Sequence, residues 1–193
     1  MNIAITLTSS TQVGEEYIEL TQKAAEYLAN YGFGIVYGGT DYGMMSELAK
    51  SYKKAGGKNL TGVMSKDLMD VTKGYVAFSG LDNAYTEDDM DHRKQKIFSL
   101  SDGVLVLPGG WGTLDEFISI ASSKINKLND KPIAIYNYNG FYDKFINFLN
   151  ELKSKGFTKI NLDQVVLISE DLDEIARYFE NYKKTDLADK FID

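Results

Sequence analysis

Short apolar runs alternate along the chain with longer segments in which apolar residues recur at helical spacing, and this alternation constrains the fold most strongly. The apolar runs predict strands at residues 3–7, 34–37, 60–64, 75–78, 103–107, 133–136 and 165–168. The segments between them predict helices at residues 15–30, 44–55, 89–100, 114–128, 141–153 and 171–182. Strands that alternate with helices form a parallel sheet covered on both faces, because each helix returns the chain to the start of the next strand.

Two of the apolar runs, residues 103–107 and 133–136, show no polar alternation, so both faces of these strands are predicted to be buried. The sequence therefore predicts an α/β fold, a three-layer sandwich around a central, mainly parallel sheet of about seven strands. No repeat, low-complexity tract or Pro-rich linker interrupts the pattern, so residues 1–193 are expected to form one domain. We expect the charged tail, residues 183–193, to be a frayed end or a short packing helix.

The composition removes several kinds of chemistry. With no Cys and a single histidine, His92, the chain has no thiol nucleophile, thiolate metal site or multi-histidine metal site. The formal charge of -7 argues against nucleic-acid binding, which depends on clustered Lys and Arg. No apolar run approaches the roughly 18 residues of a membrane helix, and the N-terminus lacks a secretory pattern. We therefore expect no membrane association and a cytoplasmic location.

Ligands of open parallel sheets bind beyond the carboxyl ends of the strands, so the loops that follow strands are the candidate sites. Residues 8–11 form a run of hydroxyl side chains, while residues 37–43 and 108–113 are glycine-rich and lead into helices. Glycine lets the backbone approach a ligand closely, and the first N–H groups of a helix have no partner within it. Together these features predict a phosphate site.

The glycines also have a purely structural interpretation, since they close tight turns between strands and helices. Neither loop matches the dinucleotide pattern G-x-G-x-x-G, because Asp115 stands where the second glycine-rich loop would need its last glycine. Neither loop carries the Lys-Ser/Thr pair of a P-loop. A hydride-transferring dinucleotide enzyme and an NTPase are therefore disfavoured.

The helix predicted at residues 89–100 carries two cations on its apolar face. At 100° per residue, Arg93 and Lys94 fall on the side defined by Met90 and Ile97. Because burying an unpaired charge is costly, either carboxylates of the protein or an anionic ligand must balance these cations.

Glu116 fits two roles. In the pattern Thr113-x-x-Glu116 the carboxylate can cap its own helix by accepting a hydrogen bond from the Thr113 backbone N–H. Helical side chains also tilt toward the helix N-terminus, which directs Glu116 toward the glycine loop and any ligand bound there. Capping and catalysis are both compatible with this position.

Residues 108–116 read P-G-G-W-G-T-L-D-E, and residues 90–94 read M-D-H-R-K. These segments resemble the P-G-G-x-G-T-x-x-E and M-x-x-R-K elements of the LOG (Lonely Guy) family of cytokinin riboside 5′-monophosphate phosphoribohydrolases, formerly described as possible lysine decarboxylases. The resemblance extends from residue 3 to about residue 182, through residues 37–44, 131–132 and 140–143. It implies a Rossmann-like fold and a nucleotide-binding homodimer that needs no metal or other cofactor.

The same resemblance assigns the candidate site residues. Arg93 and Glu116 match the catalytic pair of the family. The nucleotide-binding candidates, drawn from the loops and the cationic helix, are Gly38, Gly39, Gly110, Gly112, Thr113, Lys94 and Ser9. The Glu116 carboxylate can stabilise positive charge on the sugar, orient its hydroxyls or activate water. Arg93 can hold the phosphate, pair with Glu116 or position the leaving base.

The predicted function is hydrolysis of the N-glycosidic bond of nucleoside 5′-monophosphates, either AMP or cytokinin-type nucleotides, with release of the free base and ribose 5-phosphate. Residues 123–127 read S-K-I-N-K where the family commonly has W-A-Q-L-G, so the base preference and the dimer surface are not carried over. The alternative is a module that binds nucleotides without turnover. Decarboxylation is disfavoured, because it usually needs pyridoxal phosphate on a lysine and no pattern around Lys94 or Lys124 specifies such a site.

Overall fold

The structure, a computed structural model that describes residues 1–188, shows the expected alternation of strands and helices. The strands are β1 Asn2–Thr6, β2 Gly34–Tyr37, β3 Leu60–Ser65, β4 Asn83–Glu87, β5 Gly103–Val106, β6 Ile133–Tyr136 and β7 Leu167–Ser169. The helices are α1 Glu15–Asn30, α2 Gly43–Lys54, α3 Lys66–Val71, α4 Met90–Ser99, α5 Trp111–Ile125, α6 Asp143–Ser154 and α7 Leu172–Glu180, and short 3₁₀ segments occur at Tyr138–Gly140 and Leu162–Gln164.

The strands form one parallel sheet in the order β4-β3-β2-β1-β5-β6-β7. The register at its centre pairs Ile5 of β1 with Leu105 of β5. The strand order proceeds one way from β1 to β4 and the other way from β5 to β7. In such folds a crevice opens at the carboxyl ends of the two strands that flank this reversal. The loops after β1 and β5 are therefore the expected walls of a ligand site.

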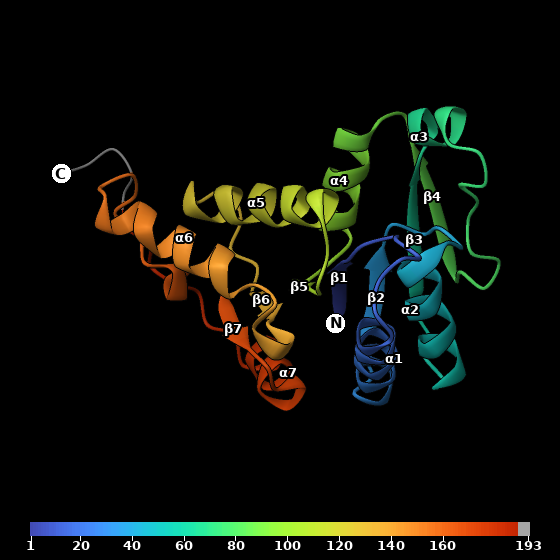
Figure 1. Cartoon of the computed structure of the whole chain (residues 1–193), viewed down its shortest axis with the longest axis horizontal. Coiled ribbons are helices and arrows are strands. Elements are labelled where there is room, and N and C mark those ends of the chain that lie inside the picture. The colour runs from blue at the N-terminus through green and yellow to red at the C-terminus, as the bar shows by residue number, and fades with distance from the viewer. Residues whose placement is uncertain (189–193) are drawn as a thin grey trace.

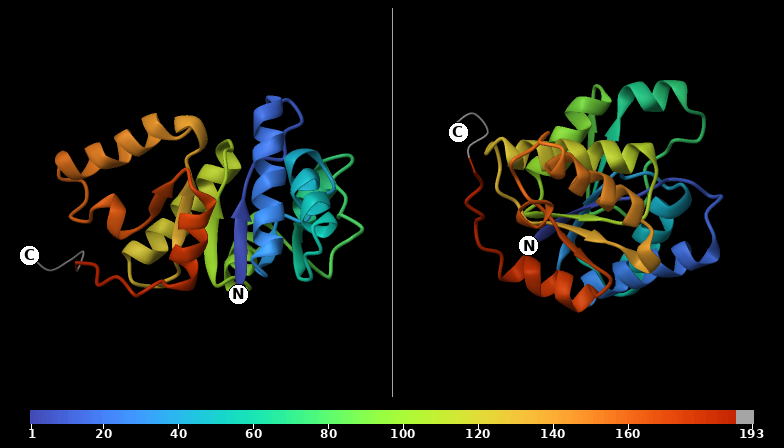
Figure 2. Two further views of the ribbon diagram at one scale, coloured as in Figure 1. Left: turned by 90° about the horizontal axis from the view of Figure 1, so that it is seen from below. Right: turned by 60° about the vertical axis from the view of Figure 1, so that its left-hand side comes forward.

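Helices cover both faces of the sheet, as Figure 1 shows from one side and Figure 2 from two others. One face packs against α1, α2 and α7 through a cluster that includes Leu28, Leu48 and Phe179. The other face packs against α4, α5 and α6 through a cluster that includes Ile97 and Phe117. The predicted three-layer α/β sandwich with a Rossmann-like sheet is confirmed.

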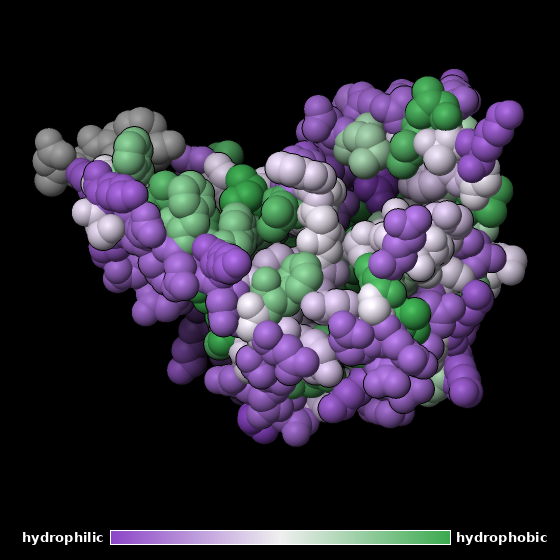
Figure 3. Space-filling model, viewed as in Figure 1, coloured by the Kyte–Doolittle hydropathy of each residue, from purple (hydrophilic) through white to green (hydrophobic). Residues whose placement is uncertain are grey.

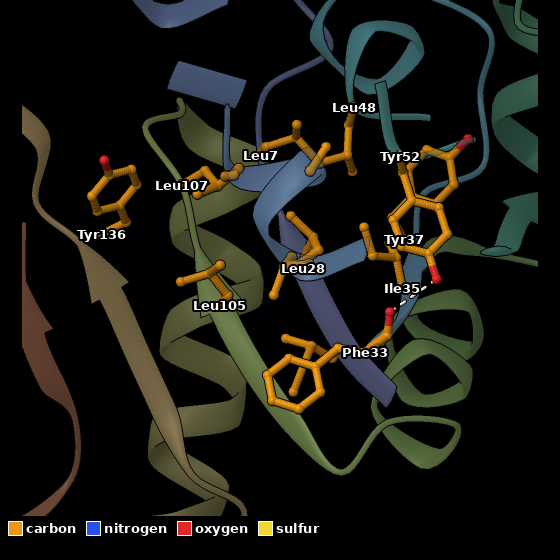
Figure 4. Packing of buried hydrophobic residues seen from close by; sticks show 14 of the residues in the cluster. Leu7, Leu28, Phe33, Ile35, Tyr37, Leu48, Tyr52, Leu105, Leu107 and Tyr136 are labelled. Atoms are coloured by element: carbon orange, nitrogen blue, oxygen red, sulfur yellow. Dashed lines mark hydrogen bonds between the residues drawn. The ribbon is translucent and has the colours of Figure 1, made fainter. Parts of the chain in front are cut away.

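The core under α1 and α2 contains tyrosines as well as aliphatic side chains. Figure 4 shows Leu28 of α1 above the sheet, with Tyr37 and Tyr52 close together at one side of the cluster. The Tyr52 hydroxyl donates a hydrogen bond to the Phe33 carbonyl oxygen at 2.9 Å. Because this buried hydroxyl has a partner, the ring packs without leaving a polar group unsatisfied. The contact anchors α2 to the residue that precedes β2.

One predicted strand is wrong. The chain forms its edge strand at β4, not at residues 75–78, and most side chains of β4 are exposed. An edge strand exposed to solvent needs no apolar run, so the segment N-A-Y-T-E carries little strand signal. Residues 75–78 instead pair antiparallel with the loop after β2, through a bridge between Ala77 and Thr40.

Two further elements depart from the prediction. Helix α3 was not predicted, because six residues are too few to establish an apolar period. Helix α5 begins at Trp111 and so includes Gly112, a residue type that disfavours helix interiors. Residues 183–188 have no regular secondary structure, and residues 189–193 of the predicted charged tail lie outside the described residues. Among residues 1–188, no helix has the length and apolar character needed to cross a membrane.

Candidate active site

A cavity of about 200 Å³ lies at the carboxyl ends of the central strands. Its walls come from the loops after β1 and β5, from the first turns of α2, α4 and α5, and from the segment between β3 and β4. The residues that line it are Leu7, Thr8, Ser9, Met45, Leu68, Tyr75, Met90, Arg93, Lys94, Gly110, Trp111, Gly112, Thr113, Asp115 and Glu116. The two residues predicted to be catalytic thus share one cavity with most of the predicted nucleotide-binding residues.

Arg93 is fixed in this cavity one turn into α4. Its side chain is buried, with 4% exposed. Arg93 Nε donates to the Val63 carbonyl oxygen of β3 at 2.9 Å, and Nη1 donates to Glu116 Oε1 at 3.2 Å. The sheet holds the guanidinium on one side and α5 holds it on the other. Of the three roles considered for Arg93, pairing with Glu116 is the one that this geometry shows.

Glu116 reaches Arg93 from the first part of α5, and the residue is buried with 9% exposed. Among the described residues, Glu116 Oε2 has no hydrogen-bond partner, so this oxygen is available to a ligand. Burial raises the pKa of the Glu116 carboxyl, and the Arg93 charge opposes the rise without cancelling it. No side chain caps the N-terminus of α5, so the capping role considered for Glu116 is not the one that the structure shows.

Lys94 lies at the rim of the cavity between two carboxylates. Its Nζ is 2.7 Å from Asp115 Oδ2 and 3.6 Å from Asp91 Oδ1. Burial acts to lower the pKa of Lys94, but the hydrogen bond and charge of Asp115 outweigh it and the pKa is raised. The protein's own carboxylates therefore balance both cations predicted on the apolar face of this helix. The first and second turns of α4 and α5 meet through these two ion pairs.

The N-terminus of α5 offers the predicted anion site. Gly110 is the N-cap residue, and the first hydrogen bond of the helix runs from the Leu114 N–H to the Gly110 carbonyl oxygen. The backbone N–H groups of residues 111–113, in the first turn of the helix, have no acceptor within it. A Cβ atom at either Gly110 or Gly112 would meet no atom within 4 Å, so both glycines border open space. Anions are favoured at such a position by the helix dipole as well.

Hydroxyl groups complete this end of the cavity. The Thr113 side chain is buried, and its Oγ1 has no hydrogen-bond partner among the described residues. Thr8 and Ser9 approach the same cavity from the loop after β1. The Thr8 hydroxyl accepts a hydrogen bond from the Ser10 backbone N–H, which shapes that loop. The site thus brings Ser9, Gly110, Gly112 and Thr113 together, as the sequence predicted.

Gly38 and Gly39 are placed differently from the other predicted residues, because both are buried and neither lines the cavity. A Cβ atom at Gly38 would lie 2.2 Å from Arg93 Nη2 and 2.8 Å from Met45 Sδ. Gly39 has a positive φ of 77° and lies against the backbone of Gly62. The missing side chain of Gly38 gives the Arg93 guanidinium the room that it occupies, and that of Gly39 lets the loop after β2 approach the backbone of β3.

This close approach makes Gly38→Ala a test of the site. The added methyl group has to displace the Arg93 guanidinium, whose Nε and Nη1 are already held by hydrogen bonds. We expect kcat for the reaction proposed below to fall about 100-fold, since a displacement of about 1 Å at a catalytic group has this effect. Steady-state kinetics, with thermal unfolding measured on the same sample, check the result.

Gly103→Ala is the matched control. Gly103 is buried at the start of β5, at the end of the strand away from the cavity. A Cβ atom at this position would lie 3.1 Å from the Phe179 ring. We expect this variant to lower the melting temperature while kcat stays at the wild-type value. Equal loss of kcat in the two variants would mean that general destabilisation, and not displacement of Arg93, explains the effect of Gly38→Ala.

Sequence reasoning missed the apolar and aromatic part of the cavity. Met45, Leu68 and Tyr75 line it from α2, α3 and the segment after α3. No spacing pattern marks these residues, and Tyr75 was assigned to a strand that the structure does not contain. Asp115 was also missed as the partner of Lys94, although its place beside Glu116 in the motif was a signal that could have found it. Within residues 1–188, no three His, Cys, Asp or Glu side chains are grouped as metal ligands.

Comparison with known proteins agrees with the motifs in this cavity. Residues 45–179 match the family model described as possible lysine decarboxylase. A probable cytokinin riboside 5′-monophosphate phosphoribohydrolase, LOGL1 of Oryza sativa subsp. japonica, is 27% identical over 172 residues, which cover 89% of this chain and 74% of the relative. The cytokinin riboside 5′-monophosphate phosphoribohydrolase LOG5 of Arabidopsis thaliana is 27% identical over 175 residues, which cover 91% of this chain and 75% of the relative.

Solved structures share the fold. One is the molybdenum cofactor binding protein of Rippkaea orientalis, which aligns with a TM-score of 0.65 and 18% sequence identity. The alignment covers 93% of this chain and 94% of that protein. At this level of identity the likeness concerns the arrangement of strands and helices, and it agrees with the sheet described above.

Proposed function

The chain belongs to the possible lysine decarboxylase family, and we propose that it hydrolyses the N-glycosidic bond of nucleoside 5′-monophosphates to release the free base and ribose 5-phosphate. The observation that carries the proposal is the buried contact between Arg93 and Glu116 in the cavity that also contains the N-terminus of α5. Similarity to phosphoribohydrolases of Oryza sativa and Arabidopsis thaliana supports this reaction class.

The reaction breaks the bond between C1′ of the ribose and a nitrogen of the base, and the electron pair of that bond leaves with the base. Positive charge then develops on C1′ and the ring oxygen, as in glycoside hydrolysis. The Glu116 carboxylate stabilises this charge, because it is held in a buried site where electrostatic interactions are strong. The oxygen of a water molecule bonds to C1′; one of its protons stays on the new sugar hydroxyl and the other is transferred to the base.

Arg93 and the N-terminus of α5 have separate tasks in this proposal. Arg93 keeps Glu116 ionised and oriented through the contact between Nη1 and Oε1. The free N–H groups around Gly112, with the Thr113 and Ser9 hydroxyls, bind the 5′-phosphate. Binding energy from the phosphate then holds the glycosidic bond beside Glu116, so nucleosides that lack the phosphate should react poorly.

The test is a panel of nucleotides incubated with the purified protein. Chromatography measures the free base, and a coupled assay measures ribose 5-phosphate. AMP, the other purine and pyrimidine monophosphates and a cytokinin riboside monophosphate form the panel, with the matching nucleosides as controls. The proposal requires equal amounts of base and ribose 5-phosphate from at least one monophosphate. The absence of both products from every member of the panel would overturn it.

The raised pKa of Glu116 predicts a pH dependence. Only the ionised carboxylate stabilises positive charge, so kcat should fall as the pH decreases through the pKa of Glu116. Because burial raises that pKa, the midpoint of this acidic limb should lie above the ordinary value of 4.5. The measurement is a profile of kcat against pH, with circular dichroism at each pH to confirm folding. A profile that stays flat down to pH 4.5, with the protein folded, contradicts the assignment.

The family description mentions lysine decarboxylation, but the lysine in this cavity does not suit covalent catalysis. A lysine that forms Schiff bases needs a lowered pKa, so that its amine is free to attack a carbonyl. The pKa of Lys94 is raised, and its ammonium group is held by Asp115. Burial does lower the pKa of Lys124, but this residue donates to the Lys131 carbonyl oxygen outside the cavity. N-glycosidic hydrolysis fits the cavity better.

Binding of a phosphate-bearing ligand without turnover is the second candidate. It is favoured by the molybdenum cofactor binding protein of Rippkaea orientalis, a ligand-binding protein whose fold this chain shares. Isothermal titration calorimetry distinguishes the two functions, since a binding module would hold an intact nucleotide that it does not cleave.

We also propose that the chain forms a homodimer, as its family resemblance implies. Figure 3 shows apolar side chains gathered on the surface over α5 and α6. Trp111, Ile118 and Phe148 contribute to the exposed apolar residues of these helices, with 91%, 45% and 56% of each residue exposed. Apolar surface of this kind supports an association through α5 and α6.

A further inference from the structure

The segment between α3 and β4 forms a wall of the cavity and is tied to the loop after β2. The Asp41 backbone N–H donates to the Val76 carbonyl oxygen at 2.8 Å, and the Phe78 N–H donates to the Gly39 carbonyl oxygen at 2.9 Å. These bonds lie on either side of the antiparallel bridge described above. Tyr75 directly precedes the tied residues, so its position over the cavity is set by backbone hydrogen bonds.

Tyr75 carries a buried hydroxyl that lies near the Arg93 guanidinium and whose own proton has no acceptor in the described part of the protein. This oxygen has no hydrogen-bond partner among the described residues, and the side chain lines the cavity with Arg93 and Glu116. Burial raises the pKa of the Tyr75 hydroxyl, while the charge of the nearby Arg93 and a contact with its guanidinium oppose the rise. The group therefore keeps its proton near neutral pH and is a hydrogen-bond donor. A buried donor without a partner is costly, and a ligand in the cavity would supply the missing acceptor.

The surroundings of Tyr75 indicate which part of a nucleotide it meets. The anion site lies at the N-terminus of α5, whereas Leu68 of α3 and Met45 of α2 give the same cavity an apolar lining to which the Tyr75 ring also belongs. Figure 1 shows α4 between α5 and α3, and residues of all three helices line the cavity. A phosphate is poorly suited to apolar side chains, but a base has apolar faces and ring nitrogens that accept hydrogen bonds.

The charged side chains near the reacting bond already have acceptors within the protein. Arg93 donates to Val63 and Glu116, and Lys94 donates to Asp115. Thr113 has a free hydroxyl, but it belongs to the anion site. Tyr75 adds a neutral O–H donor to these groups, and this donor is available to the base.

On the basis of the proposed function, we infer that Tyr75 is a leaving-group contact: its phenol O–H donates a hydrogen bond to a ring nitrogen of the departing base. As the bond to C1′ breaks, its electron pair moves onto the base, and this hydrogen bond becomes stronger. Tyr75 keeps its proton, since the proton that the base finally takes comes from the attacking water. The interaction favours the transition state over the bound substrate, so it acts on kcat more than on KM.

Tyr75→Phe tests this inference, because it removes the hydroxyl and keeps the ring. On the best purine nucleotide of the panel, we expect kcat to fall about 100-fold, as when a donor to developing charge is removed. KM and the melting temperature should change little. Tyr42→Phe is the matched control, since Tyr42 is half exposed and does not line this cavity. An unchanged kcat, or a higher KM with the same kcat, would overturn the inference.

A second substrate separates contact with the leaving group from general positioning. The N7-methylated form of the same purine nucleotide carries a cationic base, which departs as a neutral molecule and needs less stabilisation. Single-turnover rates with excess enzyme should show a much smaller loss for Tyr75→Phe on this substrate. Equal losses on both substrates would mean that Tyr75 only positions the ribose. A wild-type enzyme that cleaves no nucleotide defeats the proposed function itself, whereas an active wild type with an equally active Tyr75→Phe defeats only this inference.

Discussion

Replacing Glu116 with glutamine should lower kcat for nucleotide hydrolysis about 1000-fold, at the upper end of what the loss of one preorganised charge-stabilising group costs. The variant removes the negative charge that faces the developing positive charge on the ribose. Glutamine keeps the size of the side chain, and its amide oxygen still accepts the hydrogen bond from Arg93 Nη1. Steady-state rates of base release, compared with those of the wild type, provide the measurement.

Asp115→Asn is the matched control for Glu116→Gln. Asp115 is the neighbouring carboxylate on α5, and it is exposed and bound to Lys94. Its loss should weaken the contact between α4 and α5, with an effect on kcat far smaller than that of Glu116→Gln. If the two variants lost activity equally, or if Glu116→Gln retained full activity, Glu116 would not be the group that stabilises the transition state.

Replacing Arg93 with methionine should affect stability as well as activity. Methionine fills much of the same volume, but it leaves the Glu116 carboxylate buried without its cation. Removing one partner of a buried ion pair destabilises a protein by about 3 kcal/mol or more. The pKa of Glu116 should rise further, because burial then acts without the opposing Arg93 charge. Urea unfolding at neutral pH measures the loss of stability, and the nucleotide assay measures the loss of activity.

The double variant Arg93→Met/Glu116→Leu separates these two effects. It contains no buried charge at either position, so its free energy of unfolding should recover toward that of the wild type. Its activity should remain as low as that of Arg93→Met. A single variant Arg93→Met with wild-type stability would show that the ion pair does not contribute as the buried geometry indicates.

The sequence patterns that predicted the fold correctly are those of buried elements. The uninterrupted apolar run at β5 and the apolar strand β6 lie inside the sheet, where each has a strand on either side and all of its residues are buried. Helix α1 has the predicted bounds, because its apolar face packs on the sheet with a clear period. Buried elements need apolar residues at a regular spacing, and sequence patterns detect this spacing.

Exposed and irregular elements were the ones that the patterns placed wrongly. Strand β4 is exposed at the edge of the sheet, so hydrogen bonds to β3 define it without an apolar run. Residues 75–78 have the composition of a strand but contact the loop after β2 instead. Pairing of this kind depends on which segments meet in space, and residue types alone do not specify it.

The candidate site was predictable to a similar extent. Helical periodicity directed Arg93 inward, and the tilt of helical side chains directed Glu116 toward the glycine loop. That the two side chains meet depends on the crossing of α4 and α5 over the sheet, which periodicity does not give. Tyr75 was not predictable as a cavity residue, because a backbone contact with the loop after β2 determines its position. The position of Gly38 against Arg93, and that of Gly39 against Gly62, could be recognised only from the packing around them.

The most direct test of the account is a crystal structure of Glu116→Gln soaked with the nucleotide that the wild type cleaves best. The account predicts an intact nucleotide in the cavity, with its phosphate on the backbone N–H groups around Gly112 and its C1′ atom beside residue 116. The base should lie against Leu68 and Tyr75. A nucleotide bound with its phosphate away from α5, or with its glycosidic bond remote from residues 93 and 116, would contradict the account.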